Sequence, residues 1–233
     1  MKPTKVFDTY WRFAAERQAI FYRRLEGRER SLTSDPILQN YRFTNAYRAA
    51  DRVSQYLIRE VQYGRERSQD PNEVFFRTIL FKIFNKIETW EAIERTTGPV
   101  SWKNQKIKEL SGILDNLISR GTPIYSSAYI MSSPPFGNAR KHANHLALLG
   151  QMMTDQIPHR IAQIGSLRAA YETLSNYPGL GPFLAFQYAI DLNYSSLLTA
   201  DEAEFVVAGP GALDGISKCF NDFDDYSAEY VIN

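Results

Sequence analysis

Apolar side chains recur at three- and four-residue intervals along most of this chain, which is the spacing of one face of an α-helix. The clearest run lies between Ile161 and Leu174, and others lie in residues 7–21 and 74–84. No stretch alternates polar and apolar residues for long enough to form a sheet, and no internal repeat occurs. The pattern predicts an all-α fold of about eight or nine helices. Because no segment has the composition of a flexible linker between domains, we expect one domain, residues 1–233, with two helical lobes around a groove.

A turn rich in glycine and proline, YPGLGPFLAFQ at residues 177–187, separates two of the predicted helices. One helix should end near Asn176, and Pro182 suits the first turn of the next, where no backbone N–H is needed. The glycines permit positive φ and leave backbone N–H groups uncovered, so the turn could hold a phosphate. Over residues 161–192 the element resembles the helix-hairpin-helix of DNA glycosylases, whose form is L-P-G-h-G-x-x-x-A. A plain turn between packed helices is the alternative interpretation.

Charge and cysteine content narrow the classes of function. The net charge is +1, so any contact with nucleic acid must come from local basic patches. The single Cys219 excludes an intrachain disulfide framework and a four-cysteine metal site. We find no signal peptide and no apolar run long enough to span a bilayer, and we expect a cytoplasmic protein without a membrane partner. His142 and His145 lie three residues apart, but two ligands make a weak metal site, and we predict neither metal nor cofactor.

Five segments carry a wider resemblance. In order from Glu16 to Phe220 they are ERQAIFYRR, DPILQNYRFTNAYRAADR, FFRTILFKIFNKIETWE, YPGLGPFLAFQYAIDLNYS and AGPGALDGISKCF. Together they resemble the helical domain associated with phage hydroxymethyluracil DNA kinases, which is also found in alpha-glutamyl/putrescinyl thymine pyrophosphorylases. The resemblance implies work on bulky 5-substituted pyrimidines in phage DNA and a fold related to helix-hairpin-helix glycosylases. The chain has no GxxxxGK[ST] loop, so we do not expect it to transfer phosphate by itself.

An enzyme that acts on a base in DNA must hold the neighbouring phosphates. Backbone amides in glycine turns and basic side chains are the candidates for this task. The predicted DNA-binding residues are Gly179, Gly181, Gly209, Gly211, Arg17, Arg24, Lys141, His142 and Lys218. For each basic residue a solvated helix face is the competing interpretation. We expect the partner to be DNA, double- or single-stranded, and the protein to be monomeric.

The flipped base needs a pocket of its own. An asparagine presents a paired donor and acceptor to a pyrimidine edge, and an aromatic ring stacks on a base. The predicted base-pocket residues are Phe43, Asn45, Arg48, Asn85, Tyr125, Tyr129 and Gln187. Asn45 and Asn85 stand in apolar, aromatic segments, where a buried amide without a partner costs about 1–3 kcal/mol. Tethers between helices and core packing are the alternatives.

Carboxylates are the candidates for catalysis. Breaking an N-glycosidic bond develops positive charge on the sugar, which a nearby carboxylate stabilises. The glycosylase resemblance places this carboxylate downstream of the hairpin, where Asp201 and Glu204 lie. Asp191 follows the apolar run FLAFQYAI, where desolvation has most effect, so we rank it first and Glu204 second. Capping is the alternative for Asp191 and Asp201. Phe183 stands where bifunctional glycosylases carry a lysine, which predicts a monofunctional enzyme.

We therefore predict a DNA glycosylase, a hydrolase that flips and excises a hydroxymethylated or hypermodified pyrimidine in phage defence or repair. The first alternative is a transferase that replaces pyrophosphate on activated hydroxymethyluracil in DNA with an amine or amino acid. The second is a non-catalytic DNA-binding helical module that partners a DNA-base kinase. The first two share a base-flipping pocket and differ in the atom that the carboxylate faces.

Overall fold

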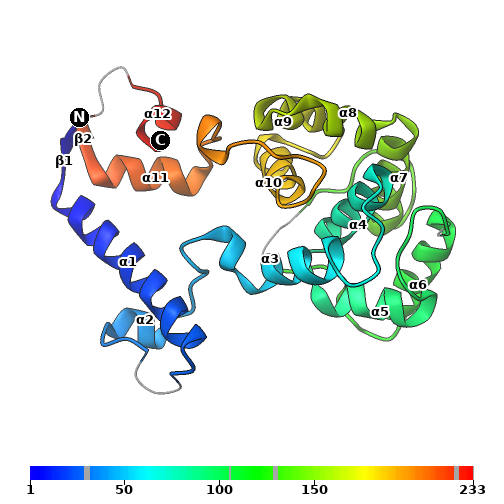
Figure 1. Ribbon diagram of the computed structural model, residues 1–233, viewed down its shortest axis with the longest axis horizontal. Helices are drawn as coiled ribbons and strands as arrows, with labels where there is room; N and C mark the ends of the chain where they lie inside the picture. Colours follow the sequence, from blue (N-terminus) through cyan, green and yellow to red (C-terminus); the bar gives the residue numbers. More distant parts are fainter. Residues whose placement is uncertain (29–31, 105, 128–130, 223–225, 233) are drawn as a thin grey trace. The chain divides into compact units, whose positions relative to one another are not determined.

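The computed structural model describes residues 1–28, 32–104, 106–127, 131–222 and 226–232, and most of them are helical (Figure 1). The predicted all-α class is confirmed. The described residues contain twelve α-helices, more than the eight or nine that we expected, and three of these helices are only five residues long. The described residues form two compact units, a terminal unit of Met1–Gln55 and Val206–Asn233 and a central unit of Tyr56–Phe205. A single domain with a groove between lobes stays a prediction.

The terminal unit is built around a long helix with little core. Its elements are β1 (Lys2–Pro3), α1 (Lys5–Leu25), α2 (Pro36–Asn40), η1 (Arg48–Ala50), α3 (Arg52–Tyr56, which ends in the central unit), α11 (Pro210–Cys219), β2 (Phe220–Asp222) and α12 (Ala228–Ile232). β1 pairs antiparallel with β2, and the Thr4 hydroxyl that caps α1 also donates a 2.6 Å hydrogen bond to the Lys218 carbonyl. α1 packs on α11, yet none of its residues is buried. Burial of apolar surface therefore stabilises this unit only weakly.

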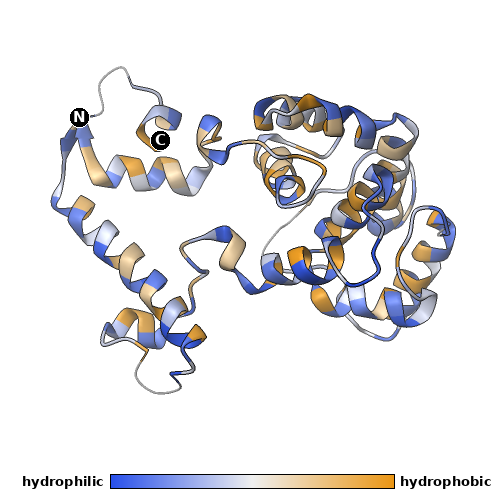
Figure 2. Ribbon diagram, in the orientation of Figure 1, coloured by the Kyte–Doolittle hydropathy of each residue, from blue (hydrophilic) through white to orange (hydrophobic). Residues whose placement is uncertain are grey.

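The central unit holds the main hydrophobic core. Its elements are η2, a π-helix (Leu57–Gln62), α4 (Pro71–Phe84), α5 (Ile87–Thr97), α6 (Ile107–Ser119), α7 (Lys141–Thr154), α8 (Ile157–Ile164), α9 (Leu167–Ser175), α10 (Pro182–Asn193) and η3 (Glu202–Glu204). Asp70 caps α4, and every residue from Glu73 to Phe84 is buried. α4 packs on η2, α7, α8 and α10, and Figure 2 shows apolar residues gathered in these helices. Because α4 is covered on several sides, its apolar residues do not form a single stripe.

Two short helices lead into the predicted hairpin. The apolar run between Ile161 and Leu174 is broken at Gly165, which has φ +62, so it forms α8 and α9 in place of one helix. The Ser166 hydroxyl caps α9 by accepting from the Ala169 N–H. α9 and α10 pack closely against each other, with the turn 176–181 between them. Among the described residues, no helix is both long and apolar enough to cross a membrane.

The core of the central unit gives a matched test of burial. Ile79 in α4 is fully buried, whereas Ile118 in α6 is exposed. We expect Ile79→Ala to lower the free energy of unfolding by about 2–5 kcal/mol, because it leaves a cavity. Ile118→Ala should change it by less than about 1 kcal/mol. Urea unfolding followed by tryptophan fluorescence measures both, and equal effects would contradict this description of the core.

Candidate nucleic-acid interface

The α9–α10 hairpin presents backbone to solvent. Gly179 has φ +84, a conformation that glycine adopts without strain, and a Cβ there would lie 3.4 Å from Pro134 Cβ. Gly181 is exposed and is the N-cap of α10, without a side-chain cap, and Pro182 is the first helical residue. Among the described residues, neither glycine N–H has a hydrogen-bond partner. The positive end of the α10 dipole and two open N–H groups together favour an anion at this turn.

The second glycine segment, in the terminal unit, shares the glycine N-cap and the following proline with the first, but it lacks a glycine with positive φ, and Gly211 lies within α11. Gly209 is the N-cap of α11, Pro210 is its first residue, and Gly211 is exposed. Lys218, also predicted to bind DNA, lies in the last turn of α11 and forms an exposed ion pair with Asp214 at 2.6 Å. Exposed pairs of this kind contribute about 0–1 kcal/mol, so Lys218 remains available for another anion.

The two basic candidates at the start of α7 occupy different environments. Lys141 is exposed, and its Nζ lies 4.8 Å from the centroid of the Tyr125 ring. His142 is buried, and its Nε2 lies 3.4 Å from Asp115 Oδ1. A buried imidazole facing a carboxylate is poorly placed to meet a phosphate, so the structure favours Lys141 over His142 as a DNA contact. Among the described residues, no three His, Cys, Asp or Glu side chains gather as a metal site would require.

The predicted catalytic residue Asp191 lies in a buried polar centre between α10 and α4. Its carboxylate has no exposed surface and forms a 3.0 Å ion pair with Lys82, whose side chain is 6% exposed. Lys82 Nζ donates to Asn85 Oδ1 at 3.1 Å, and Gln62 Nε2 donates to the Asp191 carbonyl at 2.8 Å. Asp191 and Asn85 are therefore brought together through Lys82. Lys82 was not among the predicted residues, although a lysine inside the apolar run ILFKIF was a signal for it.

Tyr125 belongs to a second buried contact. Its hydroxyl lies 2.8 Å from His145 Nδ1, and His145 Nε2 lies 2.9 Å from the Ser132 carbonyl. Burial lowers the pKa of His145 to about 4, with a smaller lowering from Lys141 and His142, so the imidazole is neutral at pH 7. Burial raises the pKa of Tyr125, which keeps its hydroxyl protonated. These contacts join Tyr125 and Ser132 to His145 of α7.

The other predicted residues of the central unit lie apart from this centre. Asp201 caps η3 by accepting from the Ala203 N–H at 2.9 Å, and Glu204 is exposed in the same turn. The three carboxylates thus share no common environment. Gln187 is half-buried in α10. Tyr129 lies outside the described residues.

The terminal unit brings four predicted residues into one pocket of about 360 Å³, which we call the arginine pocket. Its lining includes Arg17, Arg24, Tyr41, Arg42, Phe43 and Asn45. Arg17 Nε donates to the Thr44 carbonyl at 3.1 Å, and the Asn45 side-chain amide donates to the Ala50 carbonyl. Arg48 begins η1 and does not line this pocket. Arg42 and Tyr41 were not among the predicted residues, although both lie in the segment NYRFTN that supplied Phe43 and Asn45.

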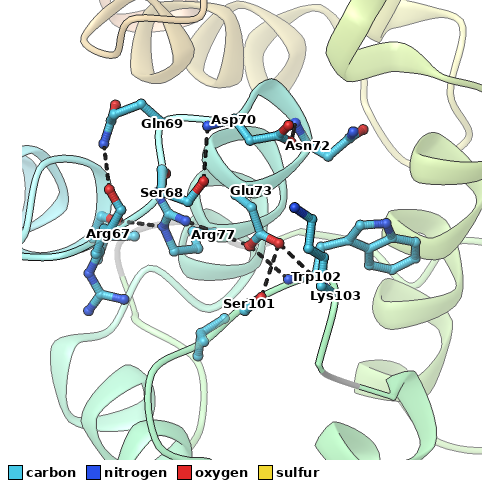
Figure 3. A network of polar contacts seen from close by, with 12 residues as sticks. Arg67, Ser68, Gln69, Asp70, Asn72, Glu73, Arg77, Ser101, Trp102 and Lys103 are labelled. Atoms are coloured by element: carbon cyan, nitrogen blue, oxygen red, sulfur yellow. Dashed lines mark hydrogen bonds and ion pairs between the residues drawn. The ribbon is translucent and has the colours of Figure 1, made fainter.

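A larger hollow of about 660 Å³, which we call the charged hollow, lies between residues 60–77 and 94–103 of the central unit. Figure 3 shows its central network, in which the buried Glu73 carboxylate accepts from the Ser101 hydroxyl and from the N–H groups of Trp102 and Lys103. Arg77 lies 3.7 Å from Glu73 and donates to the Ser68 carbonyl at 2.7 Å. These contacts hold two loops together and leave the central charges paired.

The Lys82–Asp191 pair yields a test by a double-mutant cycle. Asp191→Leu should lower the free energy of unfolding by about 3–5 kcal/mol, because it leaves a buried ammonium without its carboxylate. Adding Lys82→Met should recover much of this loss, because two apolar side chains of similar size remove both charges. Urea unfolding of the two single variants and the double variant measures the coupling. Additive losses would show that the pair carries no mutual stabilisation.

The low pKa of His145 predicts a pH-dependent stability. Between about pH 6.5 and pH 4 the unfolded chain binds a proton at this histidine that the folded chain excludes. The free energy of unfolding should therefore fall as the pH falls through this interval, by at most about 1.4 kcal/mol per pH unit from this group. His145→Gln should remove that part of the slope. Parallel curves for the two proteins, measured by urea unfolding, would contradict the assignment.

Comparison with known proteins places the chain in a family. The family model described as "5-hmdU DNA kinase, helical domain" matches residues 4–233. A curated protein of Bacillus phage SP10, named 5-hmdU DNA kinase, is 26% identical over 243 residues, which cover 95% of this chain and 37% of the relative. The chain thus spans well under half the length of this relative. No solved structure matches the chain.

These matches correct the predicted activity. The prediction of a DNA glycosylase, and with it the hydrolase class, is wrong, because the matched family and relative are described as DNA kinases. Asp191, Glu204 and Asp201 are therefore assigned no role in cleaving a glycosidic bond. A carboxylate after the hairpin does not by itself indicate a glycosylase, because here Asp191 pairs with the buried Lys82. Of the alternatives, the helical module that partners a DNA-base kinase fits the matches best. The chain belongs to the family of 5-hmdU DNA kinase helical domains.

Proposed function

We infer that this chain is a DNA-binding helical module that holds DNA for phosphorylation of a modified base by a kinase. The relative from Bacillus phage SP10 is named for action on 5-hmdU DNA, and the family description assigns its helical domain to that kinase. The sequence contains no GxxxxGK[ST] loop, so the nucleotide-dependent step falls to a separate phosphotransferase part. The role of the module is then to position DNA, which lowers the entropic barrier of the reaction.

The α9–α10 hairpin is the observation that carries this proposal. Its two glycine N–H groups have no hydrogen-bond partner among the described residues, and they lie at the positive end of the 12-residue α10. Contacts of this kind hold the DNA backbone and fix its register without reading the sequence. The exposed Lys141 at the start of α7 is a second phosphate contact under this proposal. Under this proposal, side chains outside the hairpin recognise the modified base.

A charge placed on the hairpin tests the proposal. Gly181→Asp should stabilise the helix by a few tenths of a kcal/mol, because aspartate is a good N-cap residue. The same carboxylate occupies the anion position and repels a phosphate, so the dissociation constant for DNA should rise about tenfold or more. Fluorescence anisotropy with labelled DNA containing 5-hmdU measures the affinity, and thermal unfolding measures the stability.

Ser166→Asp is the matched control. It adds the same charge at the N-cap of the neighbouring helix α9, where a side-chain cap already exists. Its affinity for DNA should stay within about twofold of the parent protein, because long-range repulsion is screened at physiological salt. Equal affinity of Gly181→Asp and Ser166→Asp would show that DNA does not contact the hairpin.

A further inference from the structure

The arginine pocket carries an unbalanced charge. Among the described residues, Arg17, Arg24 and Arg42 contribute to its lining, and no carboxylate does. The charged hollow of the central unit is lined by four basic and four acidic side chains, and the chain as a whole has a net charge of only +1. With no carboxylate beside them in the described part of the pocket, the three guanidinium groups repel one another, and an anionic ligand would relieve this repulsion.

Arg17 holds the pocket together, whereas Arg24 and Arg42 are available to bind a ligand. The Arg17 guanidinium donates to the carbonyls of Thr44 and Asn45, and its Cζ lies 5.9 Å from the Phe43 ring centroid. These contacts hold the segment 41–45 against α1. The side chains of Arg24 and Arg42 are exposed and make no hydrogen bond or ion pair with the residues that the structure describes. They are therefore the groups that can meet a phosphate, which guanidinium binds in a bidentate manner.

Aromatic rings stand beside these guanidinium groups. The side chains of Tyr41 and Phe43 are 67% and 47% exposed, although both are large and apolar enough to be buried. Phe43 is held by an edge-to-face contact with Phe13, with the ring centroids 5.0 Å apart and the planes at 86°. Exposed rings next to cationic groups are the arrangement on which the bases of single-stranded nucleic acid stack.

We propose that the arginine pocket binds one nucleotide of unpaired DNA, with Arg24 and Arg42 on the phosphate and Tyr41 or Phe43 stacked on the base. The volume of about 360 Å³ lies in the range of small-molecule sites. A base inside a duplex has both faces covered by its neighbours, so the pocket accepts only a strand that is single or locally opened. This inference rests on the proposed function and adds to it the state of the DNA that the module holds.

The test is fluorescence anisotropy of the full chain with a labelled oligodeoxythymidine strand and with a duplex of the same length. Arg24→Ala/Arg42→Ala should weaken single-strand binding by tenfold or more. The slope of log affinity against log salt should fall by about 0.7, because the variant no longer neutralises the one phosphate that both arginines contact. Tyr41→Ala/Phe43→Ala should weaken it by about tenfold with the slope unchanged, because stacking releases no counterions. Arg65→Ala/Lys103→Ala, in the charged hollow, is the matched control and should bind as the parent does.

The outcomes separate this inference from the proposed function. If the parent binds DNA and both pocket variants bind equally well, the pocket is not the site, while the DNA-binding module stands. If the parent binds neither form of DNA, both fall. If heparin displaces the strand from the parent and from Tyr41→Ala/Phe43→Ala with equal ease, the pocket recognises charge alone and the stacking is wrong.

A measurement without variants guards against loss of folding. Photo-crosslinking of the parent to an oligonucleotide containing 5-iododeoxyuridine should place the adduct on Tyr41 or Phe43, since a stacked aromatic ring lies against the base. Adducts confined to other segments would overturn the proposal.

Arg24→Lys/Arg42→Lys should retain the salt slope but lose affinity, because lysine cannot form the bidentate contact.

Discussion

The buried ion pair between Lys82 and Asp191 determines how α10 lies on α4. An unpaired charge at either site would be costly in this interior, so packing of the two helices that separated these side chains would be penalised. Gln62 adds to this by donating to the Asp191 carbonyl. Since α10 begins at the hairpin and carries Asp191 near its other end, the pair also fixes the direction in which the α10 N-terminus points. The phosphate contact proposed for Gly179 and Gly181 thus depends on a polar contact within the core.

The two units differ in the size of their hydrophobic cores and in the charge balance of their pockets. The central unit has a well-packed core, and its charged hollow is charge-balanced, with Glu73 joining two loops. The terminal unit buries no residue of its longest helix and keeps large aromatic side chains in solvent. Its three pocket arginines have no carboxylate beside them among the lining residues that the structure describes. Exposed aromatic and cationic groups on a thin core are features of a surface that binds a ligand.

Local sequence signals predicted the all-α class and the turn before α10, although they gave too few helices. Positive φ at Gly179 and Pro182 in the first turn of α10 follow from the residues themselves, and so does the all-α class. The role of Asp191 could not be predicted in this way, because its partner Lys82 lies in a distant segment and only the packing of α10 on α4 joins them. Arg17 was expected to meet a phosphate, yet it binds backbone carbonyls of its own unit. Resemblance identified the family correctly, while the order of hairpin and carboxylate led to the wrong reaction.

Amide hydrogen exchange of the full chain, with and without an oligonucleotide containing 5-hmdU, shows directly whether DNA contacts the α9–α10 hairpin. Exchange reports where backbone N–H groups become protected, so it needs no variant and no assumption about the bound base. If DNA contacts the hairpin and the arginine pocket, exchange is slower at residues 177–184 and 38–45 in the presence of DNA and unchanged at residues 98–103 of the charged hollow. Unchanged exchange at the hairpin, under conditions where the DNA is bound, would contradict the hairpin contact.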